Sequence, residues 1–221
     1  MDTVAECYNH PRRTTTILEA RKLGCVRGDR RLFSGLDFAV SPGTFIQLTG
    51  PNGSGKTSLL RILCGLLPPA EGEVSWEGAN IRSLGEEYVA SVTYLGHRHG
   101  IKEELSAIEN LRVTNALNGV EINNDKAREA LGQMGLTGRE FLPARVLSEG
   151  QRRRVALARL LVCGTKLWLL DEVLTSLDKT AVARVRSLIE SHLDGGGIAI
   201  VATHQELELD AGRTERLELT T

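Results

Sequence analysis

One stretch of the chain has the glycine, lysine and hydroxyl spacing of a phosphate-binding loop. It runs Gly50-Pro51-Asn52-Gly53-Ser54-Gly55-Lys56-Thr57. Glycines let backbone N–H groups approach phosphate oxygens in conformations that a side chain would block. The helix expected from Ser58 onward would direct its N-terminal dipole at the same charge. Lys56 is placed to pair with the β- and γ-phosphates and Thr57 to ligate Mg²⁺, so the spacing predicts a nucleoside triphosphate site that includes Ser58.

Two adjacent carboxylates, Asp171 and Glu172, follow the wholly apolar run 167–170. Such a run suits a parallel strand that is covered on both faces, and ligands bind at the carboxyl ends of parallel strands. We expect Asp171 to hold Mg²⁺ through water, and Glu172 to orient and deprotonate the attacking water. An Asp-Glu pair after an apolar strand is common by itself. Combined with the phosphate loop, it predicts an enzyme that hydrolyses a nucleoside triphosphate with Mg²⁺.

A third motif, Leu147-Ser148-Glu149-Gly150-Gln151, precedes a helix expected over about 151–161. Ser148 is a favourable N-cap residue and Gly150 permits close approach of the backbone. From chemistry alone the motif predicts an anion-binding helix start, and an ordinary helix cap is the alternative.

In their order along the chain, with the 147–151 motif between the other two, these motifs resemble those of the ABC ATPases, which carry a motif of the LSGGQ kind between the phosphate loop and the Asp-Glu strand. The resemblance implies a head-to-tail dimer that encloses ATP. Ser148 and Gly150 of one subunit would touch the γ-phosphate bound by the other, and Gln151 would belong to the same nucleotide-binding set. Glu149 stands where the family has glycine, and we expect it to point outward, where the helix dipole favours a carboxylate.

Two later motifs match the same family. Ser176-Leu177-Asp178 resembles the family's D-loop at the dimer seam, and Thr203-His204 its switch histidine. The resemblance implies that His204 contacts the γ-phosphate. Two positions depart from the family: Arg27 stands where an aromatic residue stacks on adenine, and a planar guanidinium can also stack on a purine. His97 stands in place of a glutamine and can hydrogen-bond near Mg²⁺ and the transporter interface.

Several less specific sequence segments, together with the short length of the chain, resemble the ATP-binding subunits of the haem exporters of cytochrome c maturation. These are Tyr94-Leu95-Gly96-His97, Gly100-Ile101-Lys102, the segment from Leu105 to Leu111, and Arg152-Arg153-Arg154-Val155-Ala156-Leu157-Ala158-Arg159-Leu160. One position differs: Val173 follows the catalytic glutamate, where those subunits often have proline. The resemblance implies integral membrane partners and a peripheral location on the cytoplasmic face of the bacterial inner membrane. ATPases of other ABC exporters, or a soluble ABC ATPase acting on DNA or ribosomes, are the alternatives.

The order of expected strands and helices around these residues predicts an α/β fold. It is a P-loop NTPase of the ABC ATPase type, with a parallel core sheet, an antiparallel β-subdomain and a helical subdomain over about 98–150. We expect a flexible leader over 1–16 and a single nucleotide-binding domain over 17–221. The expected strands are 45–49, about 74–76, 167–170 and 198–202, and the expected helices are 58–67, about 151–161 and about 178–193.

Net charge, the length of apolar runs and the spacing of cysteines exclude several classes of function. The formal net charge of −1 argues against an electrostatic grip on nucleic acid or anionic lipid. No stretch approaches the ~18 to 20 apolar residues that cross a bilayer, so membrane association would need another subunit. The four cysteines lack paired spacing and are expected to be reduced, small hydrophobes. Arg152, Arg153 and Arg154 would point about 100° apart on a helix, which predicts a solvated or interface helix rather than a nucleic-acid face.

Overall fold

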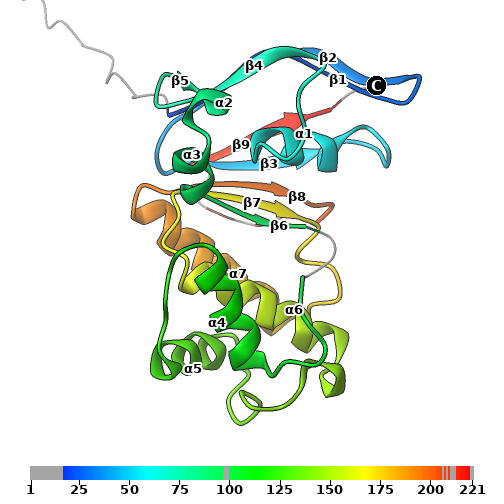
Figure 1. Cartoon of the computed structure of the whole chain (residues 1–221). Helices are drawn as coiled ribbons and strands as arrows, with labels where there is room; N and C mark the ends of the chain where they lie inside the picture. Colours follow the sequence, from blue (N-terminus) through cyan, green and yellow to red (C-terminus); the bar gives the residue numbers. More distant parts are fainter. Residues whose placement is uncertain (1–16, 97–99, 206, 208, 210–212, 220–221) are drawn as a thin grey trace, which may run out of the picture.

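A computed structural model describes residues 17–96, 100–205, 207, 209 and 213–219 (Figure 1). It contains two sheets, and helix α1 (Lys56–Leu63) contributes to the hydrophobic cluster that joins them. The antiparallel sheet has the spatial order β2-β1-β4-β5, formed by β1 (Leu18–Arg27), β2 (Arg30–Val40), β4 (Glu71–Trp76) and β5 (Ala79–Asn80). Glu77 and Gly78, both with positive φ, form the tight turn from β4 to β5.

The second sheet is parallel throughout and has the order β6-β7-β8-β3-β9. Its strands are β3 (Phe45–Thr49), β6 (Val92–Leu95), β7 (Leu167–Asp171), β8 (Ile198–Ala202) and β9 (Thr214–Glu218). Ala202 pairs with Leu48 on one side and with Asp171 on the other. The carboxyl ends of β3, β8 and β7 are therefore level, and the segments that follow them leave from one edge of the sheet. The predicted fold class is confirmed.

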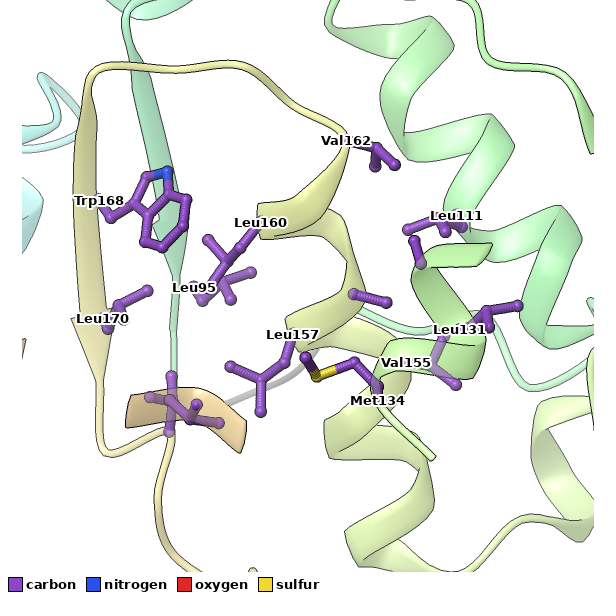
Figure 2. Packing of buried hydrophobic residues seen from close by; sticks show 14 of the residues in the cluster. Leu95, Leu111, Leu131, Met134, Val155, Leu157, Leu160, Val162, Trp168 and Leu170 are labelled. Atoms are coloured by element: carbon purple, nitrogen blue, oxygen red, sulfur yellow. The ribbon is translucent and has the colours of Figure 1, made fainter. Parts of the chain in front are cut away.

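Both faces of the parallel sheet are buried, which explains the unbroken apolar run of β7. Because successive side chains alternate, Leu167 and Leu169 join the cluster with α1 and the antiparallel sheet. Trp168 and Leu170 join the opposite cluster, among leucines of the helical layer (Figure 2). On that side the Trp168 ring stacks on His192, with ring centroids 3.6 Å apart.

The helical layer covers one face of the parallel sheet (Figure 1). It contains α4 (Ala107–Leu117), α5 (Asn124–Gln133), the 3₁₀ turn η1 (Ala144–Val146), α6 (Glu149–Ala158), the 3₁₀ turn η2 (Arg159–Leu161) and α7 (Lys179–Asp194). Side chains cap the helix starts, and Ser106 and Glu109 form a reciprocal capping box on α4. Helices therefore occupy much of the predicted insert, whereas its division from the rest as a subdomain stays a prediction. Within the described ranges no helix has the length and apolar character to span a membrane.

Several element boundaries differ from the sequence prediction. Helix α1 ends at Leu63 rather than at residue 67, because Gly65 takes a left-handed φ of +78° and Leu66 donates its N–H back to Arg61. Helix α6 begins at Glu149, two residues earlier than expected. Strand β9 and the short helices α2 (Ile81–Leu84) and α3 (Glu86–Ala90) were not predicted.

The cysteine prediction holds for the cysteines that the structure describes. Cys25 and Cys64 are buried in the cluster around α1, and Cys163 is partly buried; none of the three forms a disulfide. Burial raises the pKa of the Cys25 and Cys64 thiols, which favours the unreactive protonated form. Cys7 and the predicted leader over 1–16 lie outside the described residues.

Candidate nucleotide site

The predicted phosphate loop connects the buried strand β3 to α1, and its glycines are required by the geometry. Gly50 and Gly55 have φ values of +140° and +106°. A Cβ atom on Gly50 would lie 2.6 Å from the carbonyl oxygen of Leu219, and one on Gly55 would lie 3.0 Å from the Phe33 ring. A side chain at either position would strain the backbone, and at Gly50 it would also collide with the main chain of Leu219. The loop therefore brings backbone groups close together, as the spacing predicted.

Lys56 is held against this loop. Its side chain is buried, and Nζ donates to the carbonyl oxygens of Gly50 at 2.7 Å and Pro51 at 3.1 Å. These bonds satisfy two of the three ammonium donors and fix a positive charge beside the loop amides. An ammonium in that place would attract the terminal phosphates of a nucleotide.

A hollow of about 420 Å³ joins the loop to the carboxylates at the end of β7. It is lined by Arg27, Arg30, Leu32, Asn52, Gly53, Gly55, Lys56, Thr57, Ser58, Asp171 and Glu172. Residues that are more than a hundred positions apart in the sequence thus meet at one place, as the level strand ends require. Arg27, predicted to contact the base, lies in this lining. Three cations face two carboxylates there, a charge pattern that suits a polyanion bound with a divalent cation.

Asp171 is the last residue of β7 and is only 2% exposed. Its Oδ2 atom is buried and has no hydrogen-bond partner among the described residues. Burial of an ionised carboxylate oxygen without a partner is costly, and a metal ion or its water shell would relieve that cost. Thr57, which carries a hydroxyl, lines the same hollow. This set of hard oxygen donors fits Mg²⁺.

Glu172 follows Asp171 in an unusual backbone conformation, with φ at +54°. Its N–H donates to the carbonyl of Ala202 at 2.9 Å, which ties the turn to the end of β8. The side chain is 21% exposed, and its Oε1 lies 3.5 Å from Nε2 of His204. That distance exceeds a strong hydrogen bond but places the two predicted catalytic side chains next to each other.

The position of Arg153 differs from the prediction of a solvated or interface helix over the three arginines. The arginines of α6 point apart as expected, and Arg152 pairs with Glu149 at 3.0 Å. Arg153, however, is only 4% exposed, so it is neither solvated nor part of a surface. Its Nη1 donates to the carbonyl of Glu172 and, at 2.6 Å, to the hydroxyl of Thr175. The sequence shows no signal of this role, because the acceptors lie 19 and 22 residues farther along the chain.

Ser148 caps the start of α6, as its residue type favours. Ser148 Oγ accepts from Gln151 N at 3.2 Å, while Gln151 Oε1 accepts from Ser148 N at 2.9 Å. Glu149 points outward with its side chain 54% exposed, in agreement with the prediction. Ser148, Gly150 and Gln151 do not line the hollow around the phosphate loop.

The two later motifs are also described by the structure. Asp178 caps α7 by accepting from Ala181 N at 2.7 Å, and Ser176 has a left-handed φ of +63°. Thr203 is buried, and its hydroxyl accepts from the N–H of Gln205. His97, the predicted partner near Mg²⁺, lies outside the described residues, so its role stays a prediction.

Comparison with known proteins agrees with this geometry. The sequence profile of the ABC transporter family matches residues 33–175. The cytochrome c biogenesis ATP-binding export protein CcmA of Nitrosospira multiformis is 60% identical over 203 residues, which cover 92% of this chain and 98% of that protein. Its counterpart in Nitrosomonas europaea is 58% identical over 204 residues and covers 92% of this chain and 96% of its own length.

Solved structures show the same fold. A putative ABC transporter ATP-binding protein from Pyrococcus furiosus superposes with a TM-score of 0.78 at 26% identity, over 90% of this chain and 96% of its own. An ATP-binding cassette solved as a dimer in a post-hydrolysis state, bound to ADP and Pi, gives a TM-score of 0.76 at 22% identity, with coverage of 86% and 88%. The chain belongs to the ABC transporter family and, within it, to the ATP-binding export proteins of cytochrome c biogenesis.

Proposed function

We propose that this chain is the ATP-hydrolysing subunit of the haem exporter used in c-type cytochrome biogenesis. The observation that carries the proposal is the meeting of the phosphate loop with Asp171 and Glu172 in one hollow, in a chain that is 60% identical to a cytochrome c biogenesis export protein. ATPases of other ABC exporters share the same site chemistry. The near-complete coverage of the export protein favours the haem exporter over them.

ATP would bind with its phosphates against the loop amides and Lys56. The loop from Gly50 to Thr57, with Ser58, would supply the donors, and the side chain of Arg27 would lie against the base. Because phosphoryl transfer depends mainly on positioning and on neutralising charge, these fixed donors are the main source of catalysis. Glu172 would take a proton from the attacking water, and the neighbouring His204 would contact the γ-phosphate.

Magnesium would be held by the hydroxyl of Thr57 and, through water, by Asp171. The buried, unpartnered Oδ2 of Asp171 supports this placement. The ion would neutralise charge on the β- and γ-phosphates. Asp171 and Glu172 then have different tasks although they are adjacent, because one is buried at the strand end and the other projects from the strained turn.

The transport cycle would use two copies of the chain and separate membrane subunits. Ser148, Gly150 and Gln151 do not line the hollow of their own chain, which supports a role in the site of a second copy. ATP binding would close the head-to-tail dimer and hydrolysis would reopen it. Membrane subunits docked near His97 and the helical layer would convert closure into export, and would hold the chain at the cytoplasmic face of the inner membrane.

The catalytic part is tested with Glu172→Gln. This variant is expected to bind ATP normally and to lose at least ~100-fold in hydrolysis, the usual scale for a positioned base. Glu190→Gln serves as the control, because Glu190 lies on α7 with its side chain 40% exposed and pairs with Arg186. Near-normal turnover by Glu172→Gln would refute the assignment of the base.

The transport part is tested by affinity purification of the tagged chain from membranes. Integral membrane proteins of cytochrome c maturation are expected to co-purify, and deletion of the gene is expected to abolish c-type cytochromes. An unrelated permease that co-purifies with the chain, with cytochromes intact in the deletion strain, would favour the alternative exporter.

A further inference from the structure

We propose that Arg153 is a positioning residue that fixes the turn carrying Glu172 and connects it to the first turn of α6. The inference rests on the proposed function, since it assumes that Glu172 activates water. It assigns a task to a buried arginine that has no role in the proposed nucleotide site.

The turn after β7 needs external support because two of its residues adopt disfavoured conformations. Glu172 has φ at +54° and Ser176 at +63°, and neither is glycine. Left-handed backbone is unfavourable for an L-residue and persists only where surrounding contacts hold it. The carbonyl of Glu172 accepts hydrogen bonds from the hydroxyl and the N–H of Thr175, at 2.7 and 3.4 Å, and from Arg153. Arg153 and Thr175 thus hold the peptide group that sets the direction of the Glu172 side chain.

Arg153 is placed there at an energetic cost. Its guanidinium is buried, and its Nε atom has no hydrogen-bond partner among the described residues. Its Nη1 atom donates to a carbonyl and a hydroxyl rather than to a carboxylate. Burial lowers the pKa of Arg153, and the negative charges of Glu149 and Glu172 oppose that shift. A buried arginine of this kind contributes little to stability compared with an apolar side chain of similar volume. Its geometry, with two acceptors on one nitrogen, is instead suited to holding the turn.

The same residue ties the turn to α6. A Cβ atom on Gly150, in the first turn of α6, would lie 3.0 Å from the carbonyl oxygen of Ser176, so the helix start and the turn are in close contact. Arg153 lies three residues farther along α6 and donates to the carbonyl of Glu172, at the other end of the segment that follows β7. A displacement of the start of α6 would therefore move the peptide of Glu172. In the proposed dimer, the state of one nucleotide site would reach the base of the other through this contact.

Arg153→Met tests the role, because methionine fills the buried volume without donors. We expect kcat for ATP hydrolysis to fall roughly 10- to 100-fold, the scale of a misplaced reacting group, while KM for ATP stays unchanged. Arg154→Met is the matched control: Arg154 lies on the same helix and bonds the carbonyls of Met134 and Gly135, away from Glu172. An unchanged kcat in Arg153→Met would overturn the proposal.

A double-mutant cycle separates positioning from general destabilisation. If Arg153 acts through Glu172, adding Arg153→Met to Glu172→Gln changes single-turnover hydrolysis by less than about 2-fold. A further loss as large as that in the wild-type background would overturn the proposal. Normal turnover of Glu172→Gln alone would instead refute the proposed base, so the two failures are distinguishable.

Thr175 provides a second variant if Arg153→Met does not fold. Thr175→Val removes the hydroxyl that bonds both Glu172 O and Arg153, whereas Thr175→Ser keeps it. We expect Val to lower kcat with KM unchanged and Ser to retain near wild-type turnover. Equal turnover of the two variants would overturn the proposal.

Discussion

Replacement of Gly50 by alanine tests whether the phosphate loop depends on its backbone shape. Gly50 has φ at +140°, in a region that costs an L-residue about 1–3 kcal/mol. The new Cβ would lie 2.6 Å from the carbonyl oxygen of Leu219, about 0.8 Å closer than ordinary van der Waals contact. Leu219 cannot withdraw freely, because its N–H donates to Thr49. Relief of such a clash costs about 1–3 kcal/mol more, so we expect a total loss of roughly 2–6 kcal/mol.

Urea unfolding measures this loss, and Gly65→Ala provides the matched control. Gly65 also has a positive φ, +78°, but a Cβ there meets nothing within 4 Å, so it adds only backbone strain of about 1–2 kcal/mol. Gly50→Ala should also weaken ATP binding at least ~10-fold, because the carbonyl that holds Lys56 moves. Equal destabilisation by the two substitutions, with ATP affinity retained in both, would refute the reasoning.

Four further predictions concern the core, the pH response and the nucleotide contacts. Leu131→Ala, at a fully buried site, should lower the free energy of unfolding by about 2–5 kcal/mol, whereas Leu117→Ala, at a site that is 82% exposed, should change it by less than about 0.5 kcal/mol in urea titrations. Burial lowers the pKa of His192, so the unfolded chain binds the proton more readily; stability should fall as the pH drops from about 7.5 to 5.5, and His192→Gln should flatten that slope. Arg27→Ala should weaken ATP binding about 2- to 5-fold in a competition assay if the guanidinium stacks on the base, and an unchanged affinity would exclude stacking. Gln151→Glu keeps the capping box and therefore the stability of the free chain, so a drop in its ATPase rate would indicate contact with nucleotide in the dimer, and an unchanged rate would restrict Gln151 to capping.

The parts of the fold that could be predicted are those whose residue types are set by their own burial or backbone shape. Strand β7 was found because both its faces are covered, and the phosphate loop because its backbone requires glycine at Gly50 and Gly55. Strand β9 was missed for the opposite reason. It lies at the edge of the sheet and pairs with β3 through the backbone. Leu217 is the one apolar residue in Thr214–Glu218, so the strand has no apolar periodicity.

The reactive residues of the candidate site could be predicted from the sequence, but the residues and the turn that hold them in place could not. Asp171 and Glu172 follow an apolar strand, which is a local signal. The buried state of Arg153 is set by a turn 19 residues farther along, so a helical charge that looks solvated in sequence becomes an internal donor. The turn itself was hidden because Glu172 and Ser176 adopt left-handed conformations that their residue types do not favour.

The place where α6 begins separates the two parts of the chain that are proposed to contact nucleotide. The hollow around the phosphate loop is built from the β1–β2 hairpin, the loop and the end of β7, and Ser148 is not part of it. The contact of Gly150 with Ser176 nevertheless seats the start of α6 directly beside the turn that carries Glu172. In the proposed dimer, this short unit would touch two nucleotides: its turn would face the nucleotide of its own chain, and its helix start would face that of the second copy. Under this proposal, release of phosphate from either site would shift the peptide of Glu172 that Arg153 holds, and the two hydrolysis events would be coupled through it.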